Sequence, residues 1–210
     1  MPSASALFVF LGAALVLAAM PGPGLLYVAG RTLGGGKRDG LASSYGSALG
    51  GMVHVAAGAV GISALIMASA QAFMALKLIG GAYLIYLGIQ TWRSAGSFAD
   101  LRVEQDALNP WAAFRQGIIV EATNPKTAAF FLALLPQFID PARSVTAQFL
   151  VLGTISIVLN TAMAVLVSYS VAGLRERALR SSTLIIRLRQ ASGALLGGLG
   201  IWLLLSRKPA

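Results

Sequence analysis

The sequence predicts an all-α integral membrane protein with six transmembrane helices, arranged as two inverted three-helix repeats, and three observations lead there. Hydrophobic residues make up 57% of the 210 residues and charged residues only 11%, against about a quarter in soluble domains. A helical span takes about 20 residues, so six spans use about 120 and leave about 90 for connections. The apolar periodicity is helical, with none of the alternating segments that build a membrane barrel.

The rarer residue types exclude several chemistries. The absence of cysteine excludes disulfides, thiolate metal sites and thiol redox chemistry, and the single histidine leaves few imidazole sites, so we expect neither a metal nor a cofactor. The net charge of +9 fits basic residues that flank membrane spans. No basic stripe interleaved with aromatic residues occurs, so nucleic acid is not an expected partner and membrane lipid is.

The distribution of charge locates the spans in order. Residues 1–30 carry no charge and form the first span, and residues 40–92, charged only at Lys77, suit two spans with a turn near residues 69–71. Lys77 is expected near the entrance of the third span, with its long side chain reaching the outer interface. The mixed segment 93–115 is the one long loop, and apolar sequence returns over 116–139, 144–174 and 190–206. We therefore expect a single membrane domain with repeat A at about 1–92, a cytoplasmic loop at about 93–112 and repeat B at about 113–210.

Lysine and arginine residues are distributed unevenly between the two sides of this arrangement. The connections after spans one, three and five hold eleven of them, and the opposite side holds three. Because basic residues stay on the cytoplasmic side, the odd-numbered connections are predicted to be cytoplasmic and both termini outside.

An internal repeat links the third span to the sixth. The segment Gly81–Ile89 matches Gly193–Ile201 at six of nine positions, at a constant offset of 112. Chance similarity in sequence rich in Gly, Ala and Leu is the alternative. A repeat of three spans must insert with opposite orientation in each half, which is a recurrent transporter architecture. The four glycines at its ends are expected in helix packing, and they are Gly81, Gly88, Gly193 and Gly200.

Two proline-containing segments interrupt spans one and four. The first consists of Pro21, Gly22, Pro23 and Gly24. The prolines lack N–H groups, so the carbonyls of Leu17 and Ala19 lose their helical partners. Unsatisfied backbone is costly in lipid, so the break is expected to face protein or a wet cavity, where these carbonyls would accept from a substrate ammonium group. A kink that merely improves packing is the alternative.

The second interruption consists of Asn124, Pro125 and Lys126. Asparagine before proline predicts an N-cap and a helix restarted inside span four. A restarted helix points free N–H groups and a partial positive charge at the break, and Lys126 adds a full charge, so this end is expected to hold a substrate carboxylate. Paired breaks in corresponding spans favour a functional centre over two independent kinks.

Glu121 is the one acid well inside a predicted span. An ionised carboxylate is costly there, so Glu121 is a candidate to carry a proton during a transport cycle. The alternative is a static ion pair with Lys126, which lies about 140° away around an unbroken helix, so that pair requires the break to turn Lys126 inward.

His54 belongs to a row of small residues at a spacing of four, formed with Gly46, Gly50 and Gly58. Such rows mark helix–helix interfaces, so His54 is expected to face the bundle. Two roles stay open: a hydrogen bond across that interface, or a proton relay.

Taken in order, these motifs resemble the lysine-exporter (LysE/RhtB) family of small bacterial exporters. The resemblance rests on Met20–Gly24, Lys77–Gly88, Asn124–Lys126 and Pro136–Phe138, and it spans nearly the whole chain. It implies six helices in the bacterial inner membrane, efflux of amino acids or close derivatives driven by an ion gradient, and often homodimers. By the family's motifs, Pro21–Gly24 and Asn124–Lys126 form the transport core; no family role is transferred to Glu121 or His54.

The prediction is therefore a secondary exporter of an amino acid or small zwitterionic metabolite, working by alternating access with inward proton flow. It is not predicted to be an enzyme, although an intramembrane enzyme with a Ser–Lys dyad at Lys126 is one alternative. A cation exporter is another, but it calls for several membrane carboxylates and only Glu121 is available.

Overall fold

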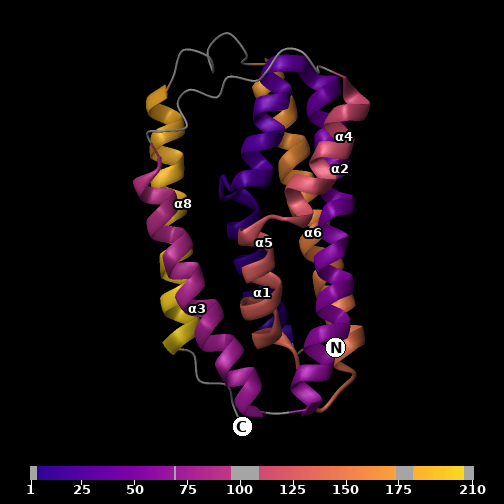
Figure 1. Ribbon diagram of the computed structural model, residues 1–210, viewed down its shortest axis with the longest axis vertical. Coiled ribbons are helices and arrows are strands. Elements are labelled where there is room, and N and C mark those ends of the chain that lie inside the picture. The colour runs from indigo at the N-terminus through magenta and orange to yellow at the C-terminus, as the bar shows by residue number, and fades with distance from the viewer. Residues whose placement is uncertain (1–3, 69, 96–108, 174–181, 206–210) are drawn as a thin grey trace.

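In the computed structural model, residues 4–68, 70–95, 109–173 and 182–205 are described, and they are helical with no β-strand among them. The long helices are α1 (Ala4–Ala19), α2 (Pro23–Ala68), α3 (Ala70–Arg93), α4 (Pro110–Ala122), α6 (Val145–Gly173) and α8 (Ser182–Leu205). Between α4 and α6 lie α5 (Pro125–Ala129), a π-helical turn (Phe130–Leu134) and a 3₁₀ turn (Leu135–Phe138). They form an elongated bundle in which α3 and α8 lie side by side along one flank (Figure 1).

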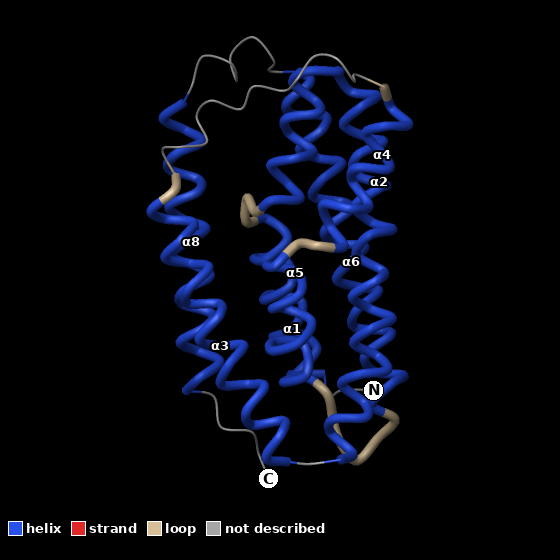
Figure 2. The backbone as a smooth tube through the Cα atoms, in the orientation of Figure 1, coloured by secondary structure: helices blue, strands red, loops and turns tan. Residues whose placement is uncertain are grey.

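Helix α2 folds back on itself at a glycine. Gly36 has φ 76°, a conformation that residues with a Cβ rarely adopt, and the chain reverses direction there at one end of the bundle (Figure 2). The two legs of α2, 23–35 and 37–68, both contact α4, because Tyr27 donates to the carbonyl of Ala113 at 2.9 Å and Gly46 packs on Phe114. The polypeptide up to Gly36 thus corresponds to the predicted first span and the second leg to the next.

The predicted first and fourth spans each correspond to a bent helix pair, and each pair is broken where the prolines predicted. The helix axes bend by 44° between α1 and α2, and by 40° between α4 and the helical segment that begins at Pro125. By length and composition, two helices in the described part of the chain could cross a membrane, 74–93 and 145–173, and four could if each bent pair counts as one span.

Some predicted boundaries shift. Helix α4 begins at Pro110 because Asn109 caps it, accepting from the backbone N–H of Trp111 at 2.8 Å, so the long loop is shorter than the charge pattern indicates. Most of that loop, 96–108, and position 69 of the predicted turn lie outside the described residues. Lys77, expected to reach the outer interface, is instead buried at 4% exposure.

The hydrophobic core gathers α1, the two turns after α5, and α6. Phe10 packs edge-on against Phe138 with ring centroids 5.5 Å apart, and Phe131 contacts both Phe130 and Phe149. The π-helical turn places Phe130 and Phe131 in this core, at 1% exposure each. Burying such aromatic side chains anchors the second half of the broken span four against α1.

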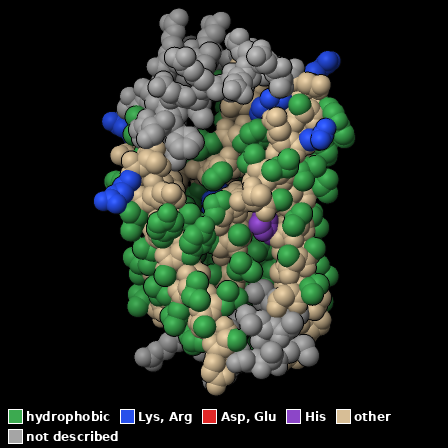
Figure 3. All heavy atoms as spheres, in the orientation of Figure 1, with side chains coloured by type: hydrophobic (Ala, Val, Ile, Leu, Met, Phe, Trp, Pro, Cys, Tyr) green, Lys and Arg blue, Asp and Glu red, His purple; other side chains and the backbone are tan. Residues whose placement is uncertain are grey.

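The surface separates charge from apolar area along the long axis. On the face shown in Figure 3, Lys and Arg side chains gather toward the end at which α2 reverses, and hydrophobic side chains are spread over much of the remaining described surface. Exposed aromatic residues such as Tyr86 and Trp202, at 56% and 42% exposure, fit a lipid-facing surface.

Candidate functional site

The two breaks meet in the middle of the bundle. Lys126, buried at 6% exposure, extends its side chain from α5 into the gap between α1 and α2. Its ammonium group donates to the carbonyls of Leu17 at 3.0 Å and Met20 at 3.1 Å. Leu17 carries one of the two carbonyls that the prolines deprive of the N–H four residues on. It also accepts from the backbone N–H of Met20 at 3.2 Å, and Lys126 of the second break adds a charged donor.

The glycines of the first break make room for side chains of the second. A Cβ placed on Gly22 would lie 3.0–3.3 Å from the end of the Lys126 side chain. A Cβ on Gly24 would collide with the carboxylate of Glu121. The alternation of proline and glycine therefore opens the helix and also lets two charged side chains approach its backbone closely.

Asn124 caps the restarted helix, as predicted from its place before Pro125. Its side-chain oxygen accepts from the backbone N–H of Lys126 at 3.0 Å. Its amide nitrogen donates to Glu121 Oε2 at 3.0 Å, and the hydroxyl of Thr127 donates to Glu121 Oε1 at 2.5 Å. The polar groups at the start of α5 thus bind the protein's own carboxylate.

Lys126 and Glu121 lie where substrate groups were expected. The carbonyl of Leu17, expected to accept from a substrate ammonium group, accepts from Lys126 in this structure. The start of the restarted helix, expected to bind a substrate carboxylate, lies beside the Glu121 carboxylate, which accepts from Asn124 and Thr127. The substrate contacts themselves stay a prediction. The break also turns Lys126 inward, yet Lys126 and Glu121, both described, are not within ion-pair distance and so do not form the static pair.

His54 reaches the same region through the backbone. Its Nε2 lies 2.9 Å from the carbonyl of Glu121, to which it must donate, and its ring stacks on Phe131 with centroids 6.0 Å apart. The structure brings His54 to the end of α4 and not to the Glu121 carboxylate. Of the glycines in its row, Gly46 and Gly50 lie against the α4 backbone and Gly58 lies against Phe149.

The repeat glycines join α3 to α8. A Cβ on Gly81 would lie 3.3 Å from the carbonyl of Gly200, and one on Gly88 would lie 2.6 Å from the carbonyl of Gly193. Conversely, a Cβ on Gly193 would lie 2.5 Å from the carbonyl oxygen of Gly88, and one on Gly200 would lie 2.7 Å from the carbonyl oxygen of Gly81. The two helices therefore run antiparallel at backbone contact.

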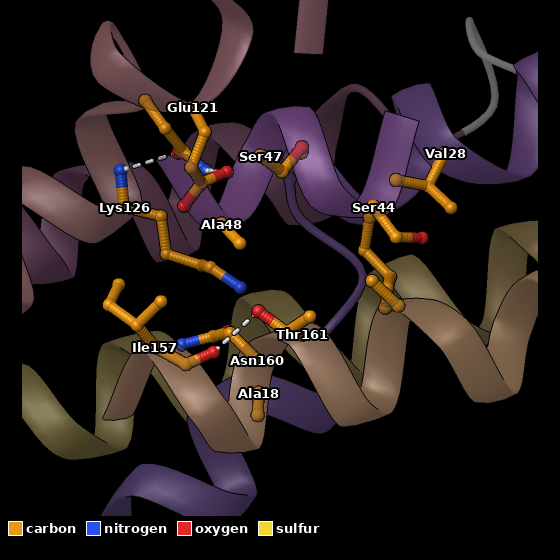
Figure 4. Close-up of a pocket in the computed structure, with 14 residues that line it drawn as sticks. Ala18, Val28, Ser44, Ser47, Ala48, Glu121, Lys126, Ile157, Asn160 and Thr161 are labelled. Carbon is orange, nitrogen blue, oxygen red and sulfur yellow. Dashed lines mark hydrogen bonds between the residues drawn. The ribbon is translucent and has the colours of Figure 1, made fainter. Parts of the chain in front are cut away.

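A small cavity lies beside the two breaks (Figure 4). Its volume is about 30 Å³, room for roughly two water molecules. Glu121, Asn124 and Lys126 line one part, and neutral polar residues of α2 and α6 line another, namely Ser44, Ser47, Asn160 and Thr161. An amino acid is larger than this cavity, so binding one there requires the surrounding helices to separate.

The residues of α2 and α6 were absent from the sequence-based site. Asn160 and Thr161 form an adjacent amide and hydroxyl in the middle of the uncharged segment 144–174, and this pair is the signal that could have identified them. Ser44 and Ser47 lie one helical turn apart in a segment rich in glycine and serine, and only the fold shows that they face the breaks. Within the described residues, no group of three or more His, Asp or Glu side chains could hold a metal ion.

Comparison with known proteins yields one family. The profile of the LysE type translocator family matches residues 15–207. An uncharacterised membrane protein of Vibrio cholerae is 34% identical over 195 residues, covering 92% of this chain and 94% of that protein. The homoserine/homoserine lactone efflux protein of Salmonella typhimurium is 37% identical over 163 residues, or 78% of each chain. No solved structure matches.

Proposed function

The chain belongs to the LysE-type translocator family, and on that premise we propose that it is a secondary exporter of small amino acids and close derivatives. The family comprises translocators and not enzymes. The observation that carries the proposal is the contact of Lys126 with the carbonyls of Leu17 and Met20, beside the Glu121 carboxylate and a polar cavity. The relative named as a homoserine/homoserine lactone efflux protein supports a substrate of that size.

The proposed architecture is a single domain of six spans in two inverted repeats, joined by the loop at about 93–112. The contacts of α3 with α8 support it. Gly81 lies against Gly200 and Gly88 against Gly193, and the offset of 112 pairs Gly81 with Gly193 and Gly88 with Gly200. A two-fold axis that relates the two repeats exchanges Gly81 with Gly193 and Gly88 with Gly200. The contact of Gly81 with Gly200 is then equivalent to the contact of Gly193 with Gly88, and both contacts are present. Alternating access would then rock one repeat against the other around the breaks.

The proposed location is the bacterial cytoplasmic membrane, with both termini outside. The start of α1 and the end of α8 lie at one end of the bundle, opposite the end where α2 reverses (Figure 1). The basic side chains near that reversal support a cytoplasmic position for it. Because the family that the chain resembles often forms homodimers, a homodimer is part of this proposal.

The two charged groups of the site suit the two ends of a zwitterion. Glu121 offers a carboxylate that now accepts from two neutral donors, Asn124 and Thr127. A substrate ammonium group is charged and would therefore form a stronger hydrogen bond with it. Lys126 offers an ammonium group that now donates to two neutral backbone carbonyls. A substrate carboxylate is charged and would bind this ammonium group more strongly than they do. In this proposal the side chains of Glu121 and Lys126 bind the substrate, in place of the freed carbonyls and the start of α5 that the sequence indicated.

Competition at Glu121 would couple export to the proton gradient. The carboxylate binds either a substrate ammonium group or a proton, so substrate leaves on the side where protons are abundant, and the protonated site returns inward empty. His54 would position the end of α4 through the Glu121 carbonyl and is the candidate through which protons reach the site.

Efflux from proteoliposomes tests this proposal. Purified protein is reconstituted with radiolabelled homoserine inside, and an inwardly directed proton gradient is imposed. We expect the gradient to accelerate efflux from liposomes with the unmodified chain, and Glu121→Gln to remove that acceleration. Asp140→Asn, which changes a half-exposed acid paired with Arg143 outside the site, is the control and should retain it.

Two results would count against the proposal. Efflux no faster than from empty liposomes, for amino acids and their lactones alike, would overturn the export function. Undiminished gradient dependence in Glu121→Gln would overturn the coupling role alone.

A further inference from the structure

We propose that Ser47, Asn160 and Thr161 form the part of the site that selects the substrate's side chain, and that they favour a side chain bearing a hydroxyl group. This inference rests on the proposed export function. These residues belong to α2 and α6, whereas Glu121 and Lys126 belong to α4 and α5 (Figure 4). The two charged residues suit the ammonium and carboxylate groups that all amino acids share, so discrimination falls to the rest of the wall.

Ser47 supplies an unused donor. Its hydroxyl oxygen is enclosed and has no hydrogen-bond partner in the described structure. A buried hydroxyl without a partner is costly, and the cost is greater where no bulk water competes. Because Ser47 lines the cavity, a substrate group that accepts its proton would satisfy it.

Asn160 and Thr161 supply acceptors. The Asn160 amide nitrogen donates to the carbonyl of Ser156 at 3.0 Å, and among the described residues none donates to its amide oxygen. The Thr161 hydroxyl donates to the carbonyl of Ile157 at 2.7 Å, which commits its proton and leaves its oxygen as an acceptor. A substrate hydroxyl is at once donor and acceptor, so it can donate to either residue while it accepts from Ser47.

The remaining wall disfavours other side chains. Ala18, Leu25, Val28 and Ile157 are apolar. A second charge on the substrate would meet the neutral groups of Ser47, Asn160 and Thr161 in place of an ionic partner. An aliphatic side chain would leave the polar groups of Ser47, Asn160 and Thr161 unpaired, and a site built for a hydroxyl rejects the analogue that lacks it for that reason.

The experiment compares two substrates that differ by one oxygen. Efflux of homoserine and of 2-aminobutyrate is measured from proteoliposomes holding the unmodified protein. 2-Aminobutyrate carries a methyl group where homoserine carries a hydroxymethyl group. We expect homoserine to leave at least about tenfold faster. In Thr161→Val and Ser47→Ala that preference should fall toward one, because homoserine slows while 2-aminobutyrate keeps its rate.

Two control variants and one melting temperature separate selection from folding. Thr154→Val changes an exposed threonine on the same helix and should keep the full preference, and Thr161→Ser keeps the hydroxyl and should do the same. Ser47→Ala removes an unpartnered hydroxyl, so its melting temperature in detergent should equal or exceed that of the unmodified protein.

The outcomes distinguish this inference from the proposed function. If neither substrate leaves faster than from empty liposomes, the export function itself is wrong. If both leave equally fast, or if Thr161→Val and Ser47→Ala slow both by the same factor, the protein is an exporter and the hydroxyl-selecting role is overturned. Loss of preference in Thr161→Ser would also overturn it.

Discussion

The carboxylate of Glu121 lies against the backbone of Gly24, in a place that only a glycine leaves open. The two residues are far apart in the chain: Gly24 belongs to the first break, and Glu121 lies in the last turn of α4, just before the second. Their contact shows that the two breaks pack directly against each other, and it leads to a specific prediction.

We predict that Gly24→Ala displaces the Glu121 carboxylate and abolishes proton-coupled efflux while the protein still folds. The added methyl group meets the end of a flexible side chain, which can move at little cost in stability. The control is Gly12→Ala, where nothing lies within 4 Å. Normal coupling in Gly24→Ala, measured in the proteoliposome assay, would show that the position of the carboxylate is unimportant.

Lys126→Met should abolish efflux and lower stability by about 1 to 3 kcal/mol, because the carbonyls of Leu17 and Met20 lose a charged donor. Lys126→Arg should not restore efflux, since the Lys126 side chain lies so close to Gly22 that even an added Cβ there would sit 3.0–3.3 Å from it, and the bulkier guanidinium group needs more room. Thermal unfolding in detergent and efflux check the two parts. An active Lys126→Arg protein would contradict the second.

Gly88→Ala should destabilise the pairing of α3 with α8 by about 1 to 3 kcal/mol, because its Cβ would lie 2.6 Å from backbone atoms of Gly193 and Gly197, which cannot rotate away. Gly198→Ala on α8 meets nothing within 4 Å and should be neutral or stabilising. The melting temperatures of the two variants decide the matter. Equal values would mean that these helices do not pack at backbone contact.

A buried ion pair spans the reversal at Gly36. Arg31 and Asp39, at 5% and 2% exposure, are joined at 3.2 Å, and Arg31 also donates to the carbonyl of Asn109 at 3.1 Å. Asp39→Asn should cost about 3 to 5 kcal/mol, because the buried guanidinium loses its carboxylate. Arg31→Met combined with Asp39→Leu should recover most of that loss. A double variant no more stable than Asp39→Asn would contradict this account.

The absence of cysteine makes the proposed orientation directly testable. Arg38 and Arg143 are exposed and lie in connections predicted to face opposite sides. We expect a membrane-impermeant maleimide to label Arg143→Cys in intact cells, and Arg38→Cys only after permeabilisation. The reverse pattern would invert the topology and the direction of transport derived from it.

Sequence alone was sufficient for the breaks, because proline acts locally. Pro21, Pro23 and Pro125 lack the N–H group that a continuous helix requires, wherever the rest of the chain lies. The cap by Asn124 followed from the same local rule. The cap of α4 by Asn109 obeys it too, and the Asn–Pro pair at 109–110 was a readable signal.

The occupants of the breaks could not be derived in this way. Local reasoning left the Leu17 carbonyl and the start of α5 open for a substrate, whereas Lys126 and Glu121 fill them. Lys77 was assigned to the outer interface by its position along the helix, yet packing buries it. Each outcome depends on which helix lies alongside, and hydropathy carries no such information.

By itself, the sequence determined that this protein is a helical membrane protein with two broken spans, since composition, periodicity and proline chemistry act within a few residues. Only the tertiary structure decided that Gly22 and Gly24 receive Lys126 and Glu121, and that α2 and α6 bring Ser47, Asn160 and Thr161 to the same cavity. Those contacts join segments distant in the chain, and their geometry follows from helix packing against helix, which no local pattern encodes.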